Sequence, residues 1–224
     1  MKALLFVDVT DPWSYIGATR FERAAAMFTI LTGEPIEFTL RAFQLEPDEP
    51  SEGRPLMDAL TERLDGLDKA EFVNVQVTAA AKITGIELNF DEAVQANSFD
   101  AWRLLTWADE DGPGVQRDLA HQLWRAYFLE GADIGDSFTL ATRAALVGLD
   151  LETAEALLAS TEYADEVRTQ VATATDLGVK QLPYVVVEQQ WTLEGVHSQN
   201  DYVQALNAIY AEWRADESSD DGSE

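Results

Sequence analysis

The stretch DVTDPWSYIG, residues 8–17, joins a buried strand to a helix and decides how the chain begins to fold. The run ALLFVDV, residues 3–9, is apolar and of strand length, as expected for a strand covered on both faces. Asp11 is a favoured helix N-cap, and Pro12 is favoured at the first helical position. The apolar positions that follow recur with helical spacing until Gly33 and Pro35, which form a stop signal.

Working outward from this stretch, the pattern predicts two separated groups of strands. Residues 36–43, IEFTLRAF, alternate between apolar and polar side chains and predict a second strand, parallel to the first. Helical patterns follow at residues 56–64, 69–84, 98–107, 115–129 and 137–145. Two helices within 151–177, a turn at 178–183, a hairpin with strands at 184–187 and 191–193, and a helix at 200–214 complete the chain.

This order of elements predicts an α/β thioredoxin-like fold that carries a large all-helical insertion. We assign residues 1–48 and 149–214 to the discontinuous thioredoxin-like domain and residues 49–148 to the helical insertion. Residues 215–224, ADESSDDGSE, are polar and acidic, and we expect them to be disordered.

Acidic residues dominate the composition. Asp and Glu number 41 against 15 Lys and Arg, which gives a formal net charge of −26. Such a negative potential repels nucleic acids and anionic membranes and excludes both as partners. Self-repulsion in the folded chain fades at high salt, because the Debye length falls to about 3 Å near 1 M. The composition therefore favours an acidic halophilic protein, and an ordinary acidic protein is the alternative.

The chain contains no cysteine, so it can form neither a disulfide nor a thiolate nucleophile. Its two histidines, His121 and His197, are too few for a zinc site unless carboxylates complete it, and we expect no metal. No apolar run is long enough to span a membrane, and the N-terminal run has no cleavage site of the signal-peptide type. We therefore expect a cytoplasmic protein.

Three stretches resemble segments of DsbA-type thioredoxin-fold proteins. Residues 8–17 resemble the active-site segment of DsbA and FrnE-like proteins, in which a strand runs into Cys-Pro-Trp-Cys-Tyr-x-Gly. Residues 178–185, GVKQLPYV, resemble the segment whose proline is cis and faces that active site. Residues 97–103, NSFDAWR, and 126–135, AYFLEGADIG, are similar to segments of FrnE-like proteins and of 2-hydroxychromene-2-carboxylate isomerases. The matches extend over most of the chain.

The resemblance implies a site and also shows where this chain departs from it. Asp11 and Ser14 stand at the two cysteine positions and are the candidate catalytic residues. The implied ligand-binding residues are Pro12, Trp13, Asn97, Leu182 and Pro183, with Pro183 as the cis-proline. Trp102 stands where a histidine is usual and is expected in the core.

Asp11 has two interpretations. As an N-cap it stabilises the helix by about 0.5–2 kcal/mol relative to alanine, and Ser14 then bonds within the first turn. As a general base it would accept a proton from a thiol or a carbon acid, which requires burial that raises its pKa. Trp13 is either a packing residue or a ligand platform, and Asn97 is either a helix cap or part of the ligand site.

Three functions are consistent with these residues. The first is a protein of the dithiol–disulfide oxidoreductase family that cannot exchange disulfides and binds a peptide or a small thiol beside Pro183. The second is an isomerase or transferase that uses glutathione or another low-molecular-weight thiol, as the chromene-carboxylate isomerases do. The third is a non-catalytic interaction protein. A homodimer is implied by resemblance to the isomerases.

Overall fold

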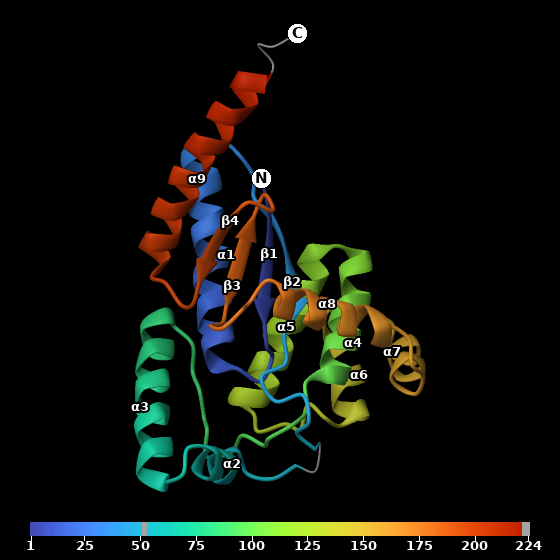
Figure 1. Cartoon of the computed structure of the whole chain (residues 1–224). Helices are drawn as coiled ribbons and strands as arrows, with labels where there is room; N and C mark the ends of the chain where they lie inside the picture. The colour runs from blue at the N-terminus through green and yellow to red at the C-terminus, as the bar shows by residue number, and fades with distance from the viewer. Residues whose placement is uncertain (51–52, 221–224) are drawn as a thin grey trace.

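A four-stranded sheet forms the centre of the computed structural model, which describes residues 1–50 and 53–220. The strands are β1 (Lys2–Val7), β2 (Glu37–Ala42), β3 (Tyr184–Val187) and β4 (Trp191–Glu194). Their spatial order is β2-β1-β3-β4, with β1 parallel to β2 and antiparallel to β3, and β4 antiparallel to β3 (Figure 1). The predicted parallel pairing of the first two strands and the predicted hairpin are confirmed.

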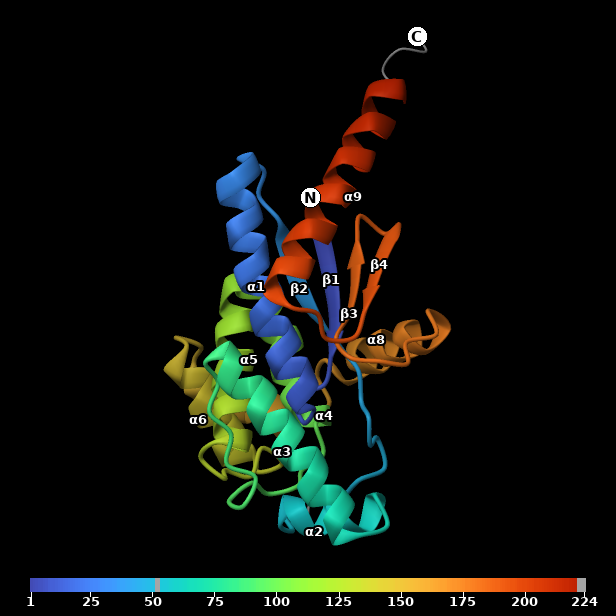
Figure 2. The same ribbon diagram turned by 90° about the vertical axis from the view of Figure 1, so that its left-hand side faces the viewer.

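Helices cover both faces of this sheet. On one face lie α1 (Pro12–Thr32) and α9 (Gln199–Asp220), side by side (Figure 2). They pack through edge-on contacts of Phe21 with Tyr202 and of Phe28 with Tyr210, each 5.5 Å between ring centres. On the other face, Ala174 of α8 (Ala164–Asp176) packs with Phe6. Because β1 is buried on both sides, its sequence is a continuous apolar run and does not alternate.

The inserted helices follow β2 and share the core of the sheet. They are α2 (Leu56–Arg63), α3 (Leu67–Thr84), α4 (Phe99–Ala108), the 3-10 turn η1 (Asp109–Asp111), α5 (Pro113–Phe128) and α6 (Ser137–Leu146), with α7 (Leu151–Leu158) leading into α8. One hydrophobic cluster runs from Leu5 and Phe21 to Trp102 and Leu123 in the inserted helices. The thioredoxin-like fold with inserted helices is confirmed, while the exact domain boundaries stay a prediction.

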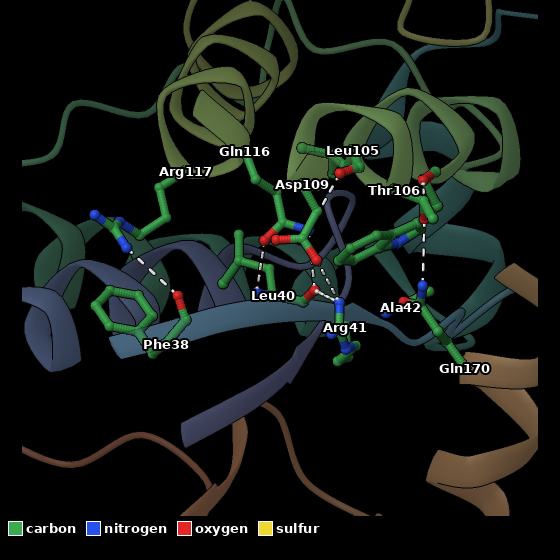
Figure 3. A network of polar contacts seen from close by, with 11 residues as sticks. Phe38, Leu40, Arg41, Ala42, Leu105, Thr106, Asp109, Gln116, Arg117 and Gln170 are labelled. Atoms are coloured by element: carbon green, nitrogen blue, oxygen red, sulfur yellow. Dashed lines mark hydrogen bonds and ion pairs between the residues drawn. The ribbon is translucent and has the colours of Figure 1, made fainter. Parts of the chain in front are cut away.

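Side chains from two helices close the outer edge of β2 (Figure 3). The backbone N–H of Leu40 donates to Oε1 of Gln116 at 2.8 Å, and Nε2 of Gln116 donates back to the Leu40 carbonyl at 3.2 Å. Two residues further along the strand, the N–H of Ala42 donates to Oε1 of Gln170 at 2.8 Å. The two amide side chains thus supply hydrogen bonds that a neighbouring strand would make, and β2 cannot recruit another strand at these positions.

Pro183 packs directly against Gly17 of α1. A Cβ placed at position 17 would lie 2.5 Å from both Cγ and Cδ of Pro183, closer than any real contact of a Cβ atom. The peptide bond between Leu182 and Pro183 is cis, as the resemblance implies. The absence of a side chain at Gly17 therefore allows the loop before β3 to approach the first turns of α1.

The end of the chain differs from the expectation from sequence. Residues 215–220 were predicted to be disordered, but α9 continues through Asp220, since no glycine or proline interrupts the chain between Gln199 and that point. The rest of the predicted disordered tail, residues 221–224, lies outside the described part of the chain. No helix in the described part combines the length and the apolar character needed to cross a bilayer.

Replacing Gly17 with alanine should destabilise the protein. Alanine in place of glycine normally stabilises a helix by about 1 kcal/mol. At position 17 the new Cβ would collide with Pro183, and this overlap should destabilise the folded protein by about 1–3 kcal/mol. The control is Gly114→Ala in α5, where nothing lies within 4 Å of the new Cβ. Urea unfolding should show a loss of stability for the first variant and none for the second. Equal effects at both positions would contradict the packing of Pro183 on Gly17.

Candidate functional site

Asp11 occupies the N-cap of α1 and its carboxylate is held by the first turn. Its backbone is extended (φ −99°, ψ 117°), Oδ2 accepts from the N–H of Ser14 at 2.7 Å, and Oδ1 accepts a longer bond from the N–H of Trp13 at 3.3 Å. The predicted capping role is therefore confirmed. Among the described residues Oδ1 has this one long hydrogen bond, so capping leaves it the capacity to accept another from a ligand.

The buried Ser14 side chain fixes the orientation of the Asp11 carboxylate. Its hydroxyl donates to Oδ2 of Asp11 at 2.8 Å and accepts from the backbone N–H of Asp8 at 3.1 Å. The residue is completely buried. In this structure the two side chains at the cysteine positions are thus bonded to each other, with Ser14 underneath and Asp11 toward the hollows described below.

Asp8 is a second buried carboxyl that the sequence analysis did not single out. Its Oδ2 accepts from the N–H of Leu45 at 2.8 Å, and its Oδ1 accepts from the N–H of Thr10 at 3.2 Å. Only 1% of the residue is exposed, and this burial raises its pKa. An acidic residue at the end of an apolar strand was the available signal. Asp8 fixes the backbone of Leu45, which forms a wall of the site.

Burial also raises the pKa of Asp11, to about 6. The hydrogen bonds from the Ser14 hydroxyl and backbone oppose this rise, whereas the neighbouring charge of Asp8 adds to it. A carboxyl with a pKa close to neutrality is well suited to exchange a proton with a bound molecule. The cap is therefore formed, while a role of Asp11 as a general base stays a prediction.

Two hollows meet at Asp11, Trp13 and Leu45, which line both of them. The first, termed the apolar cavity, has a volume of about 170 Å³ and extends beneath Pro12 toward the inserted helices. Its walls are mainly apolar side chains from α2, α3, α5 and the loop after α3, including Leu56, Leu60, Val73, Val77, Phe90 and Phe128. Local sequence gave no signal for this cavity, because its walls come from segments far apart in the chain.

The second hollow, termed the Leu182 groove, has a volume of about 310 Å³ and lies on the side of the cis-proline loop. Gln181, Leu182, Gly195 and Val196 complete its lining. Pro183, the residue after Leu182, packs on Gly17 of α1. Five of the seven predicted site residues, Asp11, Pro12, Trp13, Leu182 and Pro183, therefore come together around the groove and the cavity, with Ser14 directly beneath.

Asn97 lies elsewhere. It lines a separate polar hollow with Gln44 and Arg168, and its side chain is fully engaged. Its Oδ1 accepts from the N–H of Phe99 at 2.9 Å and from Nε2 of Gln44 at 3.2 Å. Its Nδ2 donates to two backbone carbonyls of the loop after β2, at 3.0 and 2.8 Å. These bonds correspond to the capping interpretation and tie that loop to the start of α4.

Arg20 and Arg103 are held in structural contacts. Arg20 donates to Thr84 and to two backbone carbonyls, and Arg103 donates to Asp100 and to three carbonyls. Lys180, two residues before Leu182, is exposed and forms no ion pair with any described residue. It is therefore the cation available to a ligand with a carboxylate.

The histidines and the acidic residues do not form a metal site within residues 1–50 and 53–220. His121 contacts Oε2 of Glu22 through Nε2 at 2.9 Å, and His197 contacts the carbonyl of Glu194 at 3.1 Å. Trp102 is fully buried in the core, in agreement with its expected role.

Comparisons with known proteins agree with the thioredoxin-like fold. A family model described as a DSBA-like thioredoxin domain matches residues 4–207. The structure of a probable DsbA oxidoreductase from Streptomyces coelicolor superposes with a TM-score of 0.86 and 29% identity, over 95% of this chain and 91% of that one. No curated protein matches this sequence.

Two more distant structures share the fold. A 2-hydroxychromene-2-carboxylate isomerase superposes with a TM-score of 0.65 at 14% identity, over 98% of each chain. The cytosolic disulfide reductase DsbM from Pseudomonas aeruginosa, in its structure with GSH, superposes with a TM-score of 0.63 at 17% identity, over 94% of this chain and 100% of that one.

The raised pKa of Asp11 should make its contribution to stability fall as pH rises. The unfolded chain loses this proton near pH 3.8 and the folded chain near pH 6, so the folded state is penalised increasingly between these values and constantly above them. The variant Asp11→Asn retains a good cap and escapes this penalty. Its stability relative to the parent should rise between pH 4 and 7 by about 2–3 kcal/mol, since each tenfold change in an acid constant is worth about 1.4 kcal/mol.

The measurement is urea unfolding at several pH values in molar KCl. Asp150→Asn is the matched control, because Asp150 caps α7 through the same type of bond but is exposed, and its hydrogen bonds with Thr153 lower its pKa. Its stability relative to the parent should stay nearly constant between pH 4 and 7, because a carboxyl with a lowered pKa loses its stabilising effect only as pH falls below the unfolded value of 3.8. A pH-independent difference for Asp11→Asn would contradict the raised pKa.

Proposed function

This chain belongs to the DSBA-like thioredoxin family, and we propose that it is a non-redox member that binds a small thiol or an extended peptide in the Leu182 groove. Disulfide exchange requires a thiolate that attacks a disulfide and a second thiol that resolves the mixed disulfide. The chain has no sulfur of this kind at any position, and a carboxylate at Asp11 cannot form a stable bond to sulfur. The family's site is retained here without its redox chemistry.

The observation that carries the binding proposal is that the backbone groups of Leu182 are unpaired. Neither its backbone N–H nor its C=O is hydrogen-bonded to another residue in the described part of the chain, and the residue lines the groove. Unpaired backbone donors and acceptors beside a groove can pair with an extended peptide backbone. A tripeptide thiol such as glutathione offers the same groups.

Asp11 and Lys180 supply further recognition for a thiol. Asp11 stands at the inner end of the groove, where its carboxylate can accept a hydrogen bond from an S–H group. Lys180 directly precedes the groove residues Gln181 and Leu182 in the chain. Its side chain is exposed and can neutralise a ligand carboxylate. Such a cation matters in a chain whose net charge is −26 and which would otherwise repel an anionic ligand.

A second candidate is a thiol-dependent isomerase or transferase. The observation that favours it is the position of Asp11 between the Leu182 groove and the apolar cavity, because a thiol in one and an acceptor in the other would meet at this carboxyl. With a pKa of about 6, Asp11 can take a proton from one and return it to the other, and no net oxidation is needed.

Calorimetric titration in molar KCl tests the binding proposal. We expect micromolar affinity for glutathione and about a tenfold loss in Asp11→Asn, as expected for one charge-assisted hydrogen bond. S-methylglutathione has no S–H group, so its affinity should be the same for the parent and the variant. Lys180→Gln should weaken both ligands, whereas Lys69→Gln, in α3, should weaken neither.

The outcomes separate the functions. An equal response of both ligands to Asp11→Asn would leave Asp11 as a helix cap only. Binding of a short extended peptide but not of glutathione would favour a peptide-binding protein. The absence of heat with every thiol and peptide would contradict the proposal and favour an interaction protein without a small ligand.

A further inference from the structure

The apolar cavity contains a polar group that the fold itself does not use. Tyr127 of α5 lines the cavity and is 1% exposed, and its ring packs edge-on against Phe128 at 4.7 Å. Its hydroxyl makes no hydrogen bond to any residue within 1–50 or 53–220. Buried hydroxyl groups are normally hydrogen-bonded, so a phenol on a cavity wall that has no partner among the described residues is able to donate to a molecule in the cavity.

The size and lining of the cavity limit what that partner is. A volume of about 170 Å³ is close to that of a cavity of about 150 Å³ that holds benzene in another protein. The walls from Leu56, Leu60, Val73 and Val77 offer only apolar contact. The space therefore suits one substituted six-membered ring.

The charges around the cavity limit its chemistry further. Asp11 and Glu46 are acidic, and Arg63, the cation on the lining, is already paired with Glu46 at 3.1 Å. An anion would meet this negative potential without a free cation to offset it. A cation would suit Asp11 but would offer the Tyr127 hydroxyl no acceptor. Donors on the lining therefore favour a neutral molecule with an acceptor oxygen.

Gln95 adds a second donor to the same wall. Its Oε1 already accepts from Nε of Arg54 at 3.0 Å, which leaves its amide nitrogen as the group free to donate. Tyr127 and Gln95 are both lining residues with donor capacity, and a carbonyl oxygen can accept from two donors.

We propose that the apolar cavity binds a small neutral ring molecule with a carbonyl oxygen, and that Tyr127 determines specificity by donating a hydrogen bond to that oxygen. This site shares Asp11, Trp13 and Leu45 with the Leu182 groove, but it needs no thiol or peptide bound there. Asp11 lies on the lining of the same cavity, so a molecule bound in this way would place its carbonyl and neighbouring carbon atoms in a space shared with a titratable carboxyl.

A pair of probes of equal shape tests the proposal. Acetophenone carries a carbonyl oxygen, and α-methylstyrene replaces that oxygen with a methylene group of similar size. Titration of the intact protein in molar KCl, followed by NMR chemical shifts, should show tighter binding of acetophenone. Tyr127→Phe should weaken acetophenone about tenfold and leave α-methylstyrene unchanged. Val77→Trp, which fills the cavity, should abolish binding of both probes.

Stability provides an independent readout. Because the Tyr127 hydroxyl has no partner among the described residues, Tyr127→Phe should unfold at the same temperature as the parent or higher. A clear loss of stability would reveal a structural partner and overturn the assignment. So would failure of both probes to bind the parent, or equal weakening of both by Tyr127→Phe. Glutathione binding that persists when both probes fail would remove this proposal and leave the groove proposal standing.

Discussion

The contact between Pro183 and Gly17 is the constraint on which the site depends. Only a residue without a side chain lets the proline ring reach α1, since a Cβ at position 17 would lie 2.5 Å from two of its carbon atoms. This contact brings the loop that carries Leu182 to the first turn of α1, which carries Asp11. The Leu182 groove is the space that remains between them. The groove is therefore a product of backbone packing, and it persists although both residues at the cysteine positions have changed.

The second constraint is the burial of two carboxyls at one strand–helix junction. Asp8 holds the backbone of Leu45, and its own N–H donates to the Ser14 hydroxyl, which in turn donates to Asp11. Burial raises the pKa of both acids, so this junction costs stability at neutral pH. A site that only capped a helix would need neither the second acid nor the enclosed surroundings, and Asp150 caps α7 while fully exposed. Perturbed acids of this kind are more typical of functional sites than of structural ones.

Short patterns in the sequence predicted the local elements of the fold, but they did not predict the part of the site that the inserted helices form. The parallel pairing of the first two strands, the cap at Asp11, the hairpin at β3 and β4 and the cis-proline all followed from short patterns or from the resemblance. The apolar cavity did not, because Leu56, Val77 and Tyr127 come from three helices whose packing no local period describes. Asn97 matched a family segment, but its side chain bonds to the loop after β2 and does not line the cavity or the groove. The acidic composition of residues 215–224 predicted disorder, but α9 continues to Asp220 because no glycine or proline stops it.

We propose that this chain retains the frame of a disulfide-exchange site and lacks only the two thiols. Restoring both thiols tests this most directly, through the rate of insulin reduction with dithiothreitol for the parent and for the double variant Asp11→Cys, Ser14→Cys. The parent should match the uncatalysed rate. The double variant should accelerate the reaction, because its first thiol would sit at the N-terminus of α1, where thiolates are stabilised. Turnover by the parent, or a folded double variant that stays at the uncatalysed rate, would contradict the account.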